Sequence, residues 1–200
     1  MPLQKRELDI AGKFEKIMLL QRYHINTVKY YYFKINSDIS DIEDICQFEN
    51  ISIRTQSPRK EMDVWLPKWI NVDKERGINI LSDALKKYNV LIAEAINPEK
   101  TIKCGNVAVL DEYIIIEIAY GSGIVDKITS RGIVDKRWIT TISTYYKDIE
   151  DLDILSVVES IVNLPYINVI IEFSCYNDNV GIYNQRYVVW DILNWKEKNK

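Results

Sequence analysis

The alternation of apolar and polar residues along the chain predicts amphipathic helices separated by short strands. Apolar residues recur at helical spacing over residues 9–22, where Asp9 is the candidate N-cap. Two further helices are expected over residues 78–88 and 150–162. The acidic segment between the first two strands predicts another helix, over residues 38–48.

Runs rich in β-branched and aromatic side chains predict strands between these helices. Short polar turns separate the last of these runs, at residues 177–179 and 184–185. Since strands joined by tight turns pair as antiparallel hairpins, the fold class is predicted to be α+β. The predicted strands are residues 28–35, 51–54, 90–96, 102–109, 113–119, 137–144, 167–176, 180–183 and 186–192.

The chain has 200 residues, which suits one domain with a sizeable core. No change of composition marks a domain boundary, so a single compact unit over residues 1–200 is expected. A division into two lobes, about residues 1–100 and 101–200, stays open. The first six residues are polar and no run of eighteen apolar residues occurs, so we expect a cytoplasmic protein with no membrane span.

Charge and composition restrict the kinds of ligand and metal site that this chain can have. The net charge of −3 does not suggest a protein that coats nucleic acid. A single histidine, His24, excludes a His-rich metal site and disfavours a serine triad. The three cysteines form no CxxC pair, so any metal is expected to be a hard cation held by carboxylates.

The common phosphate-binding motifs are absent. No GxxxxGK[ST] sequence occurs in the chain. Gly121 and Gly123 begin a glycine pattern, but Asp126 stands where a dinucleotide-binding fingerprint needs its third glycine. Taken alone, this glycine pair indicates a flexible turn.

A series of short motifs nevertheless follows a suggestive order. The motifs are Ala11-Gly12-Lys13, then Ser52 to Ser57, Leu91 to Ile96, Cys104-Gly105, Ile116 to Gly123 with Gly132 to Asp135 and Trp138 behind it, Ile171-Glu172-Phe173 and Tyr187 to Asp191. In this order the motifs resemble the ATP-binding domain of phosphoenolpyruvate synthase and pyruvate phosphate dikinase, which has an ATP-grasp fold. The resemblance extends over about residues 9–192.

The resemblance implies ATP as the nucleotide. Lys13 and Arg54 would contact its phosphates and position the γ-phosphate, since Arg presents a planar fork to phosphate oxygens. Thr55 would add a hydroxyl donor, together with Ser57. The backbone near Glu94, Ala95 and Ile96 would bind the adenine edge. The complete set of predicted nucleotide contacts is Lys13, Arg54, Thr55, Glu94, Ile96 and Glu117.

The resemblance also implies Mg²⁺, held by Glu172 and Asp191 between the β- and γ-phosphates. Three departures from the family pattern limit this comparison. Ile170 replaces a family Asp, Ile124 replaces the Glu that holds the ribose, and the Gln-x-Arg pair of the last strand is missing. The sequence therefore supports nucleotide binding better than phosphoryl transfer, and it excludes phosphoenolpyruvate synthesis by this chain alone.

Each of these residues also has an ordinary structural interpretation. Lys13 is a typical surface lysine of a helix, and Arg54 could pair with Glu61 or Asp63. Glu117 and Glu172 alternate with apolar neighbours, as solvent-facing strand residues do. A residue at the end of a strand such as Asp191 can equally cap a turn or form a surface ion pair.

Three functions remain open. The leading hypothesis is a Mg-ATP-binding protein of ATP-grasp type whose two lobes clamp the nucleotide for phosphoryl transfer or ligation to an unknown small-molecule or protein acceptor. The second is a non-catalytic interaction or regulatory module on the same fold. The third is a nucleic-acid-binding protein that stacks bases on aromatic residues, which the acidic total opposes. Those aromatic residues are Tyr30, Tyr31, Tyr32, Trp65 and Trp69.

Overall fold

The computed structural model describes the chain apart from residues 1–5, 10–11, 40–46, 59–65, 122–131 and 196–200. Two compact units make up the chain. Unit 1 comprises Met1–Ile10, Lys16–Thr27 and Pro98–Lys200, and unit 2 comprises Ala11–Glu15 and Val28–Asn97. Each unit has its own sheet and its own apolar core.

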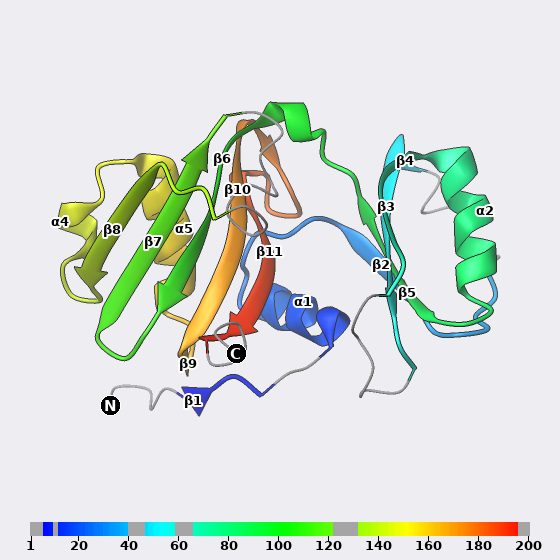
Figure 1. Ribbon diagram of the computed structural model, residues 1–200, viewed down its shortest axis with the longest axis horizontal. Coiled ribbons are helices and arrows are strands. Elements are labelled where there is room, and N and C mark those ends of the chain that lie inside the picture. Colours follow the sequence, from blue (N-terminus) through cyan, green and yellow to red (C-terminus); the bar gives the residue numbers. More distant parts are fainter. Residues whose placement is uncertain (1–5, 10–11, 40–46, 59–65, 122–131, 196–200) are drawn as a thin grey trace. The chain divides into compact units, whose positions relative to one another are not determined.

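Unit 2 is built on a four-stranded antiparallel sheet with a helix, α2 (Lys74–Ala84), against one face (Figure 1). Its core is formed by Ile51, Ile53 and Ile92 of the sheet, which pack with Leu81 of α2. In spatial order the strands are β2 (Tyr30–Phe33), β5 (Asn89–Glu94), β3 (Asn50–Gln56) and β4 (Lys68–Asp73).

Helix α2 begins four residues earlier than the predicted range of 78–88, and it ends at Ala84. The side chain of Asp73 accepts a hydrogen bond from the amide of Arg76 at 2.9 Å and so starts the helix before its apolar stripe begins. Gly77 allows the helix to approach the sheet closely, because a Cβ there would lie 2.2 Å from Cδ1 of Ile51. The cap therefore sets the start of the helix, which apolar periodicity alone did not locate.

Unit 1 is built on a five-stranded antiparallel sheet. Helix α5 (Leu152–Val162) lies against one face of this sheet (Figure 1) and contributes Ile154, Val157 and Ile161 to the core. In spatial order the strands are β11 (Gln185–Asn194), β10 (Val169–Val180), β6 (Thr101–Val109), β7 (Tyr113–Tyr120) and β8 (Lys136–Thr141).

Shorter elements complete the chain. The predicted helix 9–22 is confirmed as α1 (Lys13–Arg22), but it begins too late for Asp9 to cap it. The division between the two units falls inside α1, after Glu15. The remaining elements are β1 (Arg6–Glu7), which pairs in parallel with β9 (Tyr166–Ile167), the 3₁₀ turn η3 (Pro98–Lys100) and α4 (Tyr145–Asp148).

The turn of the β10–β11 hairpin lies at residues 181–184, so the turn predicted at 177–179 is wrong. Asn26, which is fully buried, explains this position: its Nδ2 donates to the carbonyl of Val180 at 2.9 Å, and its Oδ1 accepts from the amide of Tyr183 at 2.8 Å. Gly181 has a positive φ of 77°, and a Cβ there would meet the Asn26 side chain at 2.6 Å. A distant asparagine thus determines where the hairpin turns.

The remaining sequence predictions are confirmed only in part. The strand expected over residues 28–35 is confirmed as β2, and that expected over 51–54 extends to Gln56 as part of β3. Most of the helix predicted over 38–48 lies outside the described residues. Strand β4 was not predicted, because five of its six side chains are exposed or half-buried and show no clear alternation.

Lys103 of β6 anchors the sheet to α5 through two carboxylates. Its Nζ donates to Asp151 at 2.6 Å and to Asp153 at 2.8 Å, and Asp151 also caps α5 by accepting from the amide of Ile154. Burial alone would raise the pKa of Asp151, but the hydrogen bonds from Lys103 and Ile154 outweigh it, so this pKa lies below its ordinary value. Burial likewise opposes the charge of Lys103, yet the two carboxylates raise its pKa.

The substitution Lys103→Met is expected to destabilise the protein by about 3 kcal/mol at pH 7, because it strands two partly buried carboxylates. Since the pKa of Asp151 is lowered on folding, the stabilisation it contributes is present above its unfolded pKa and is lost as the pH falls through the folded one. The difference in free energy of unfolding between the wild type and the variant should therefore become smaller in acid. Urea unfolding at pH 7 and pH 3 measures both effects.

The matched control is Lys100→Met, because the Lys100–Asp178 ion pair is more than half exposed on both sides. This substitution should lower the free energy of unfolding by less than about 1 kcal/mol. Equal losses for the two variants would contradict the anchoring role of Lys103.

Candidate functional site

One face of the unit 1 sheet carries a row of polar side chains that crosses all five strands. The register pairs Asp191 with Glu172, Glu172 with Asn106, Asn106 with Glu117 and Glu117 with Arg137. Directly paired residues of antiparallel strands project from the same face of the sheet. We call this the carboxylate face; the opposite face packs against α5, with residues such as Ile171 and Phe173 in the core.

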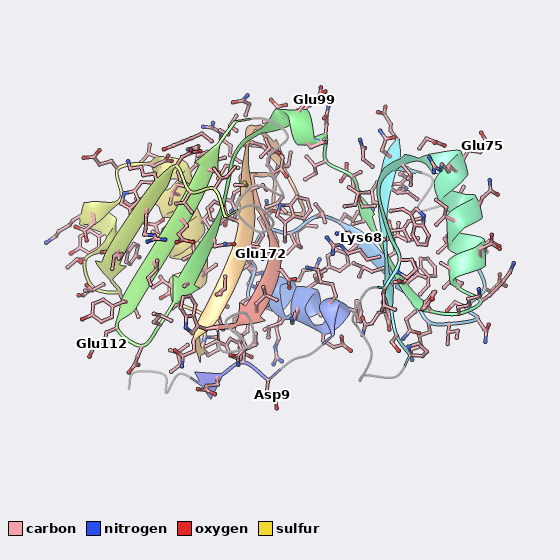
Figure 2. All side chains as sticks on the ribbon, viewed as in Figure 1. Asp9, Lys68, Glu75, Glu99, Glu112 and Glu172 are labelled. Atoms are coloured by element: carbon pink, nitrogen blue, oxygen red, sulfur yellow. The ribbon has the colours of Figure 1, made fainter. Side chains whose placement is uncertain are left out.

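Glu172 and Asp191, the two predicted metal ligands, are therefore direct neighbours near the middle of β10 and β11 (Figure 2 shows Glu172). A β-bulge makes this possible. The pairing shifts from Glu172–Asp191 to Phe173–Val189, so Trp190 is the extra residue, and its Nε1 donates to Ser174 Oγ at 2.8 Å. If Trp190 instead paired regularly after Val189, it would lie opposite Glu172, and Asp191 would pair with Ile171.

Asn106 extends the pair to the third strand. Its Oδ1 is buried and has no hydrogen-bond partner, although most buried polar atoms in proteins have one. Among the described residues no three His, Cys, Asp or Glu side chains gather as a metal site. The directly paired carboxylates of Glu172 and Asp191 are nevertheless the oxygen ligands that a hard cation such as Mg²⁺ takes, so these two residues fit this ion.

Glu117, predicted as a nucleotide contact, lies next along the row. It forms an ion pair with Arg137 of β8, and the Arg137 side chain is 58% exposed while that of Glu117 is 26% exposed. The sequence analysis missed both Asn106 and Arg137. Period-two alternation could have assigned Asn106 to the face of Cys104 and Ala108, but only the strand order brings it beside Glu172.

Unit 2 gathers cations on the sheet face that lies opposite α2. Arg54 is paired directly with Leu91 of β5 and with Lys68 of β4. Like charges directly opposite each other on a sheet are unfavourable, so this pair favours binding of an anion. Lys68, labelled in Figure 2, was not among the predicted residues, because β4 itself was not predicted.

The first turn of α1 lies against the same face. Tyr32 is paired with Leu91, and the Phe14 ring stacks on the Tyr32 ring with centroids 4.0 Å apart. In addition, Gln56 Nε2 donates to Glu15 Oε2 at 3.5 Å. Lys13, the first residue of α1, therefore lies on the face that carries Arg54.

Two predicted nucleotide contacts are engaged inside unit 2. The Thr55 hydroxyl donates to the Pro67 carbonyl at 2.7 Å, so this side chain already has an acceptor. The amide of Glu94 donates to Lys29 O at 3.1 Å, and the next amide, of Ala95, donates to the carbonyl of Asn50 at 3.0 Å. Ile96 lies just after β5 and is half-buried.

The aromatic residues proposed for base stacking pack inside unit 2 as far as they are described. Tyr31 contacts Phe48, with ring centroids 5.9 Å apart. Trp69 packs against the apolar core. Tyr30 is half-buried, and Trp65 lies outside the described residues. The four described members of this set are half-buried, which does not favour base stacking on them.

The described cysteine thiols are buried. Burial raises the pKa of Cys175 to about 12, so a nucleophilic thiolate is suppressed there. Cys104 packs with Ala119 on the carboxylate face. Cys46 lies outside the described residues.

Comparison with solved structures identifies the fold. The chain superposes on the D-alanine–D-alanine ligase of Coxiella burnetii with a TM-score of 0.57 and 8% identity, covering 92% of this chain and 47% of that one. It matches a RimK domain ATP-grasp protein of Sphaerobacter thermophilus with a TM-score of 0.57 and 12% identity, covering 92% and 58%. The macrocyclase MdnC of Microcystis aeruginosa, bound with its precursor peptide MdnA, gives 0.53 and 14%, covering 92% and 53%.

The chain has an α+β fold of the ATP-grasp type, as the motif order predicted. It spans about half the length of these solved structures. No family model and no curated protein matches the sequence. The matched structures do not single out the phosphoenolpyruvate synthase branch, so that finer resemblance stays a prediction. No helix in the described ranges has the length and apolar character needed to cross a membrane.

Cys104 and Cys175 are expected to resist alkylation in the folded protein. With a pKa of about 12, only about one Cys175 in ten thousand carries a thiolate at pH 8. Iodoacetamide treatment followed by peptide mass spectrometry should find both sites modified in urea but not in buffer. Rapid modification of Cys175 in buffer would contradict its burial.

Proposed function

We propose that this protein binds a Mg-nucleotide, with ATP as the nucleotide. The observation that carries the proposal is the direct pairing of Glu172 with Asp191 on the carboxylate face. Two carboxylates side by side supply the oxygen ligands that a divalent cation takes. The ATP-grasp fold of the chain supports the assignment.

In this proposal Glu172 and Asp191 are the ligands of the divalent cation. When bound, Mg²⁺ neutralises negative charge on the phosphate oxygens and orients them. Asp191 already has a defined orientation, since its Oδ1 accepts a hydrogen bond from the amide of Ile192 at 2.9 Å. The sheet thus restricts both ligands before any ion arrives, which lowers the entropic cost of binding.

The cations of unit 2 bind the phosphates. Arg54 and Lys68 are neighbours of like charge, and Lys13 belongs to the same face. A polyphosphate supplies negative charge to these cations, and the Arg54 guanidinium can bind two oxygens at once. Lys68 joins the two predicted cations as a third phosphate contact. These groups position the γ-phosphate for reaction.

The adenine contact falls to the backbone of Ile96. The amides of Glu94 and Ala95 are already used by the carbonyls of Lys29 and Asn50. We therefore expect the backbone contact to the base to begin at Ile96, one residue after Ala95, the centre of the predicted segment. The half-buried Ile96 side chain also offers apolar surface to a base.

The reaction would be phosphoryl transfer or ligation onto an acceptor. Two of the compared proteins are named a ligase and a macrocyclase, and one of them is bound with a precursor peptide, which favours ligation to a small molecule or a peptide. The resemblance to the phosphoenolpyruvate synthase domain instead favours phosphoryl transfer. In either case this chain contributes positioning and charge stabilisation.

A non-catalytic module on the same fold is the second candidate. Ile170 stands where the related pattern has an acidic residue, and the last strand lacks its Gln-x-Arg pair. Nucleotide binding without turnover would favour this candidate. Incubation of the protein with Mg-ATP and analysis for ADP, AMP and pyrophosphate decides between the two.

The substitution Glu172→Gln is expected to weaken Mg-ATP binding at least about tenfold, equivalent to ~1.4 kcal/mol, because it removes one charged ligand. The wild-type protein should bind ATP more tightly with Mg²⁺ than with EDTA. Isothermal titration calorimetry measures both. The control is Glu112→Gln, a neutralised carboxylate at the turn between β6 and β7 (Figure 2), which should bind as wild type does.

Lack of any heat with millimolar Mg-ATP for the wild type would overturn nucleotide binding. Equal weakening by Glu112→Gln would show only a general charge effect.

The substitution Lys68→Thr is expected to weaken ATP binding about tenfold while stabilising the nucleotide-free protein by ~0.5 kcal/mol, since it removes a cross-strand repulsion with Arg54. Calorimetry measures the first effect and urea unfolding the second. Lys34→Thr, an exposed lysine just after β2, is the control and should change neither. A Lys68→Thr protein that is less stable and binds ATP normally would assign Lys68 a structural role.

A further inference from the structure

Strand β8 forms an outer edge of the unit 1 sheet, and among the described residues no strand pairs with its outer side. In an antiparallel ladder, backbone hydrogen bonds join every second residue to the neighbouring strand. The amide of Ile142 donates to the carbonyl of Glu112, so residues 136, 138 and 140 bond to β7 in the same alternation. The residues that direct their backbone N–H and C=O groups outward are therefore Arg137, Ile139 and Thr141.

The other edges of the two larger sheets have protection that β8 lacks in the described part of the chain. Open edges pair readily with another chain, and proteins shield them with short strands, bulges or covering segments. Asn26 covers the edge of β11, because its carbonyl accepts from the amide of Val189 at 2.8 Å. Strand β4 has a register shift against β3, with Asn71 at a positive φ of 54°, and β2 is only four residues long. In contrast, β8 pairs with β7 over six residues without a register shift.

Exposed apolar side chains gather along the open edge. Ile139 of β8 is 66% exposed. Tyr113, which is paired with Thr141, is also exposed, and so is Tyr146 of α4, the helix that follows β8 (Figure 1). Scattered exposed apolar residues are ordinary, whereas a group of them beside an unpaired strand marks an interaction surface.

The two cations at the start of β8 are engaged within unit 1. Arg137 forms its ion pair with Glu117 of β7. Lys136 lies over the Trp138 ring, with Nζ 4.4 Å from the ring centroid. Charged side chains shield an edge when they project across it, and these two are held elsewhere. The rest of the strand, residues 138–141, carries no charge.

We propose that the open edge of β8 pairs with β8 of a second copy of this chain, antiparallel and about a two-fold axis at Ile139. In this register Ile139 lies opposite its own copy, and Arg137 lies opposite the partner's Thr141. All three outward residues then exchange backbone hydrogen bonds, and the two five-stranded sheets join into one. The Thr141 carbonyl already accepts from the amide of Thr144 at 3.2 Å, and a carbonyl oxygen can accept a second bond.

The sequence of the strand selects this register and favours a second copy as the occupant. An axis at Arg137 would set two guanidinium groups opposite each other, which is unfavourable. An axis at Thr141 would carry the pairing past the end of the strand into the turn before α4. Around Ile139 the strand complements itself, with an apolar pair at the centre and no like charges opposed. A strand of another protein would have to supply that complement by its own sequence.

Sedimentation equilibrium of the full chain tests the proposal. One strand pair is a small interface, so the association is weak and is followed up to about 0.2 mM protein. The wild type should approach twice the chain mass of 23.5 kDa. Ile139→Lys and Ile139→Glu each set like charges opposite one another at the axis, so each should weaken dimerisation at least about tenfold. An equal mixture of the two variants should recover the dimer, because an ammonium then lies opposite a carboxylate.

Ile70→Lys is the matched control, since Ile70 is an exposed isoleucine of the edge strand β4, and it should dimerise as wild type does. Because the Ile139 side chain is exposed, its variants should melt close to the wild type in circular dichroism. A wild type that stays monomeric at the highest concentration would overturn the proposal, even if β8 bound an extended peptide. A dimer that Ile139→Lys leaves unchanged, or a variant mixture that stays monomeric, would also overturn it. The measurements need no nucleotide, so they are independent of the proposed function.

Discussion

The register of β10 with its two neighbours is the constraint on which the candidate site depends. Side chains alternate between the two faces of a strand, so Ile171 and Phe173 enter the core while Glu172 faces the other way. A slip of one residue would bury the carboxylate and expose the apolar pair. The apolar core of unit 1 therefore enforces the position of Glu172, and the bulge at Trp190 keeps Asp191 beside it.

Strand β6 connects the stabilising side of the sheet to the candidate site. Lys103 projects toward α5 and binds Asp151 and Asp153, whereas Asn106 belongs to the carboxylate face. Odd and even positions of one strand thus face α5 and the candidate site separately. Such a division holds polar groups in a defined orientation, which is what binding with little reorganisation requires.

How far the sequence predicts this molecule depends on the range of the interaction that decides each feature. Alternation within one segment was sufficient for β6 and β7, and the motif order pointed to Glu172 and Asp191. The start of α2 was missed because a single cap, Asp73, overrides apolar periodicity. The position of the last hairpin turn was missed because Asn26, far away in the sequence, determines it.

Asn106 and Lys68 were missed for a related reason. Each is an ordinary residue within its own strand, and each gains significance from the strand paired with it. Lys68 matters because β3 places Arg54 opposite it, and Asn106 belongs to the polar row because β10 places Glu172 there. Strand order is a property of the whole sheet, so no local pattern contains it.

The two sheets share an electrostatic feature that argues for binding over a purely structural role. Each gathers like charge by direct pairing: Glu172 with Asp191 in unit 1, and Arg54 with Lys68 in unit 2. Like charges directly opposite each other on neighbouring strands are destabilising. A bound cation would lower the electrostatic cost of the first pair, and a bound anion that of the second. Each unit by itself therefore supports the proposed binding of a charged ligand.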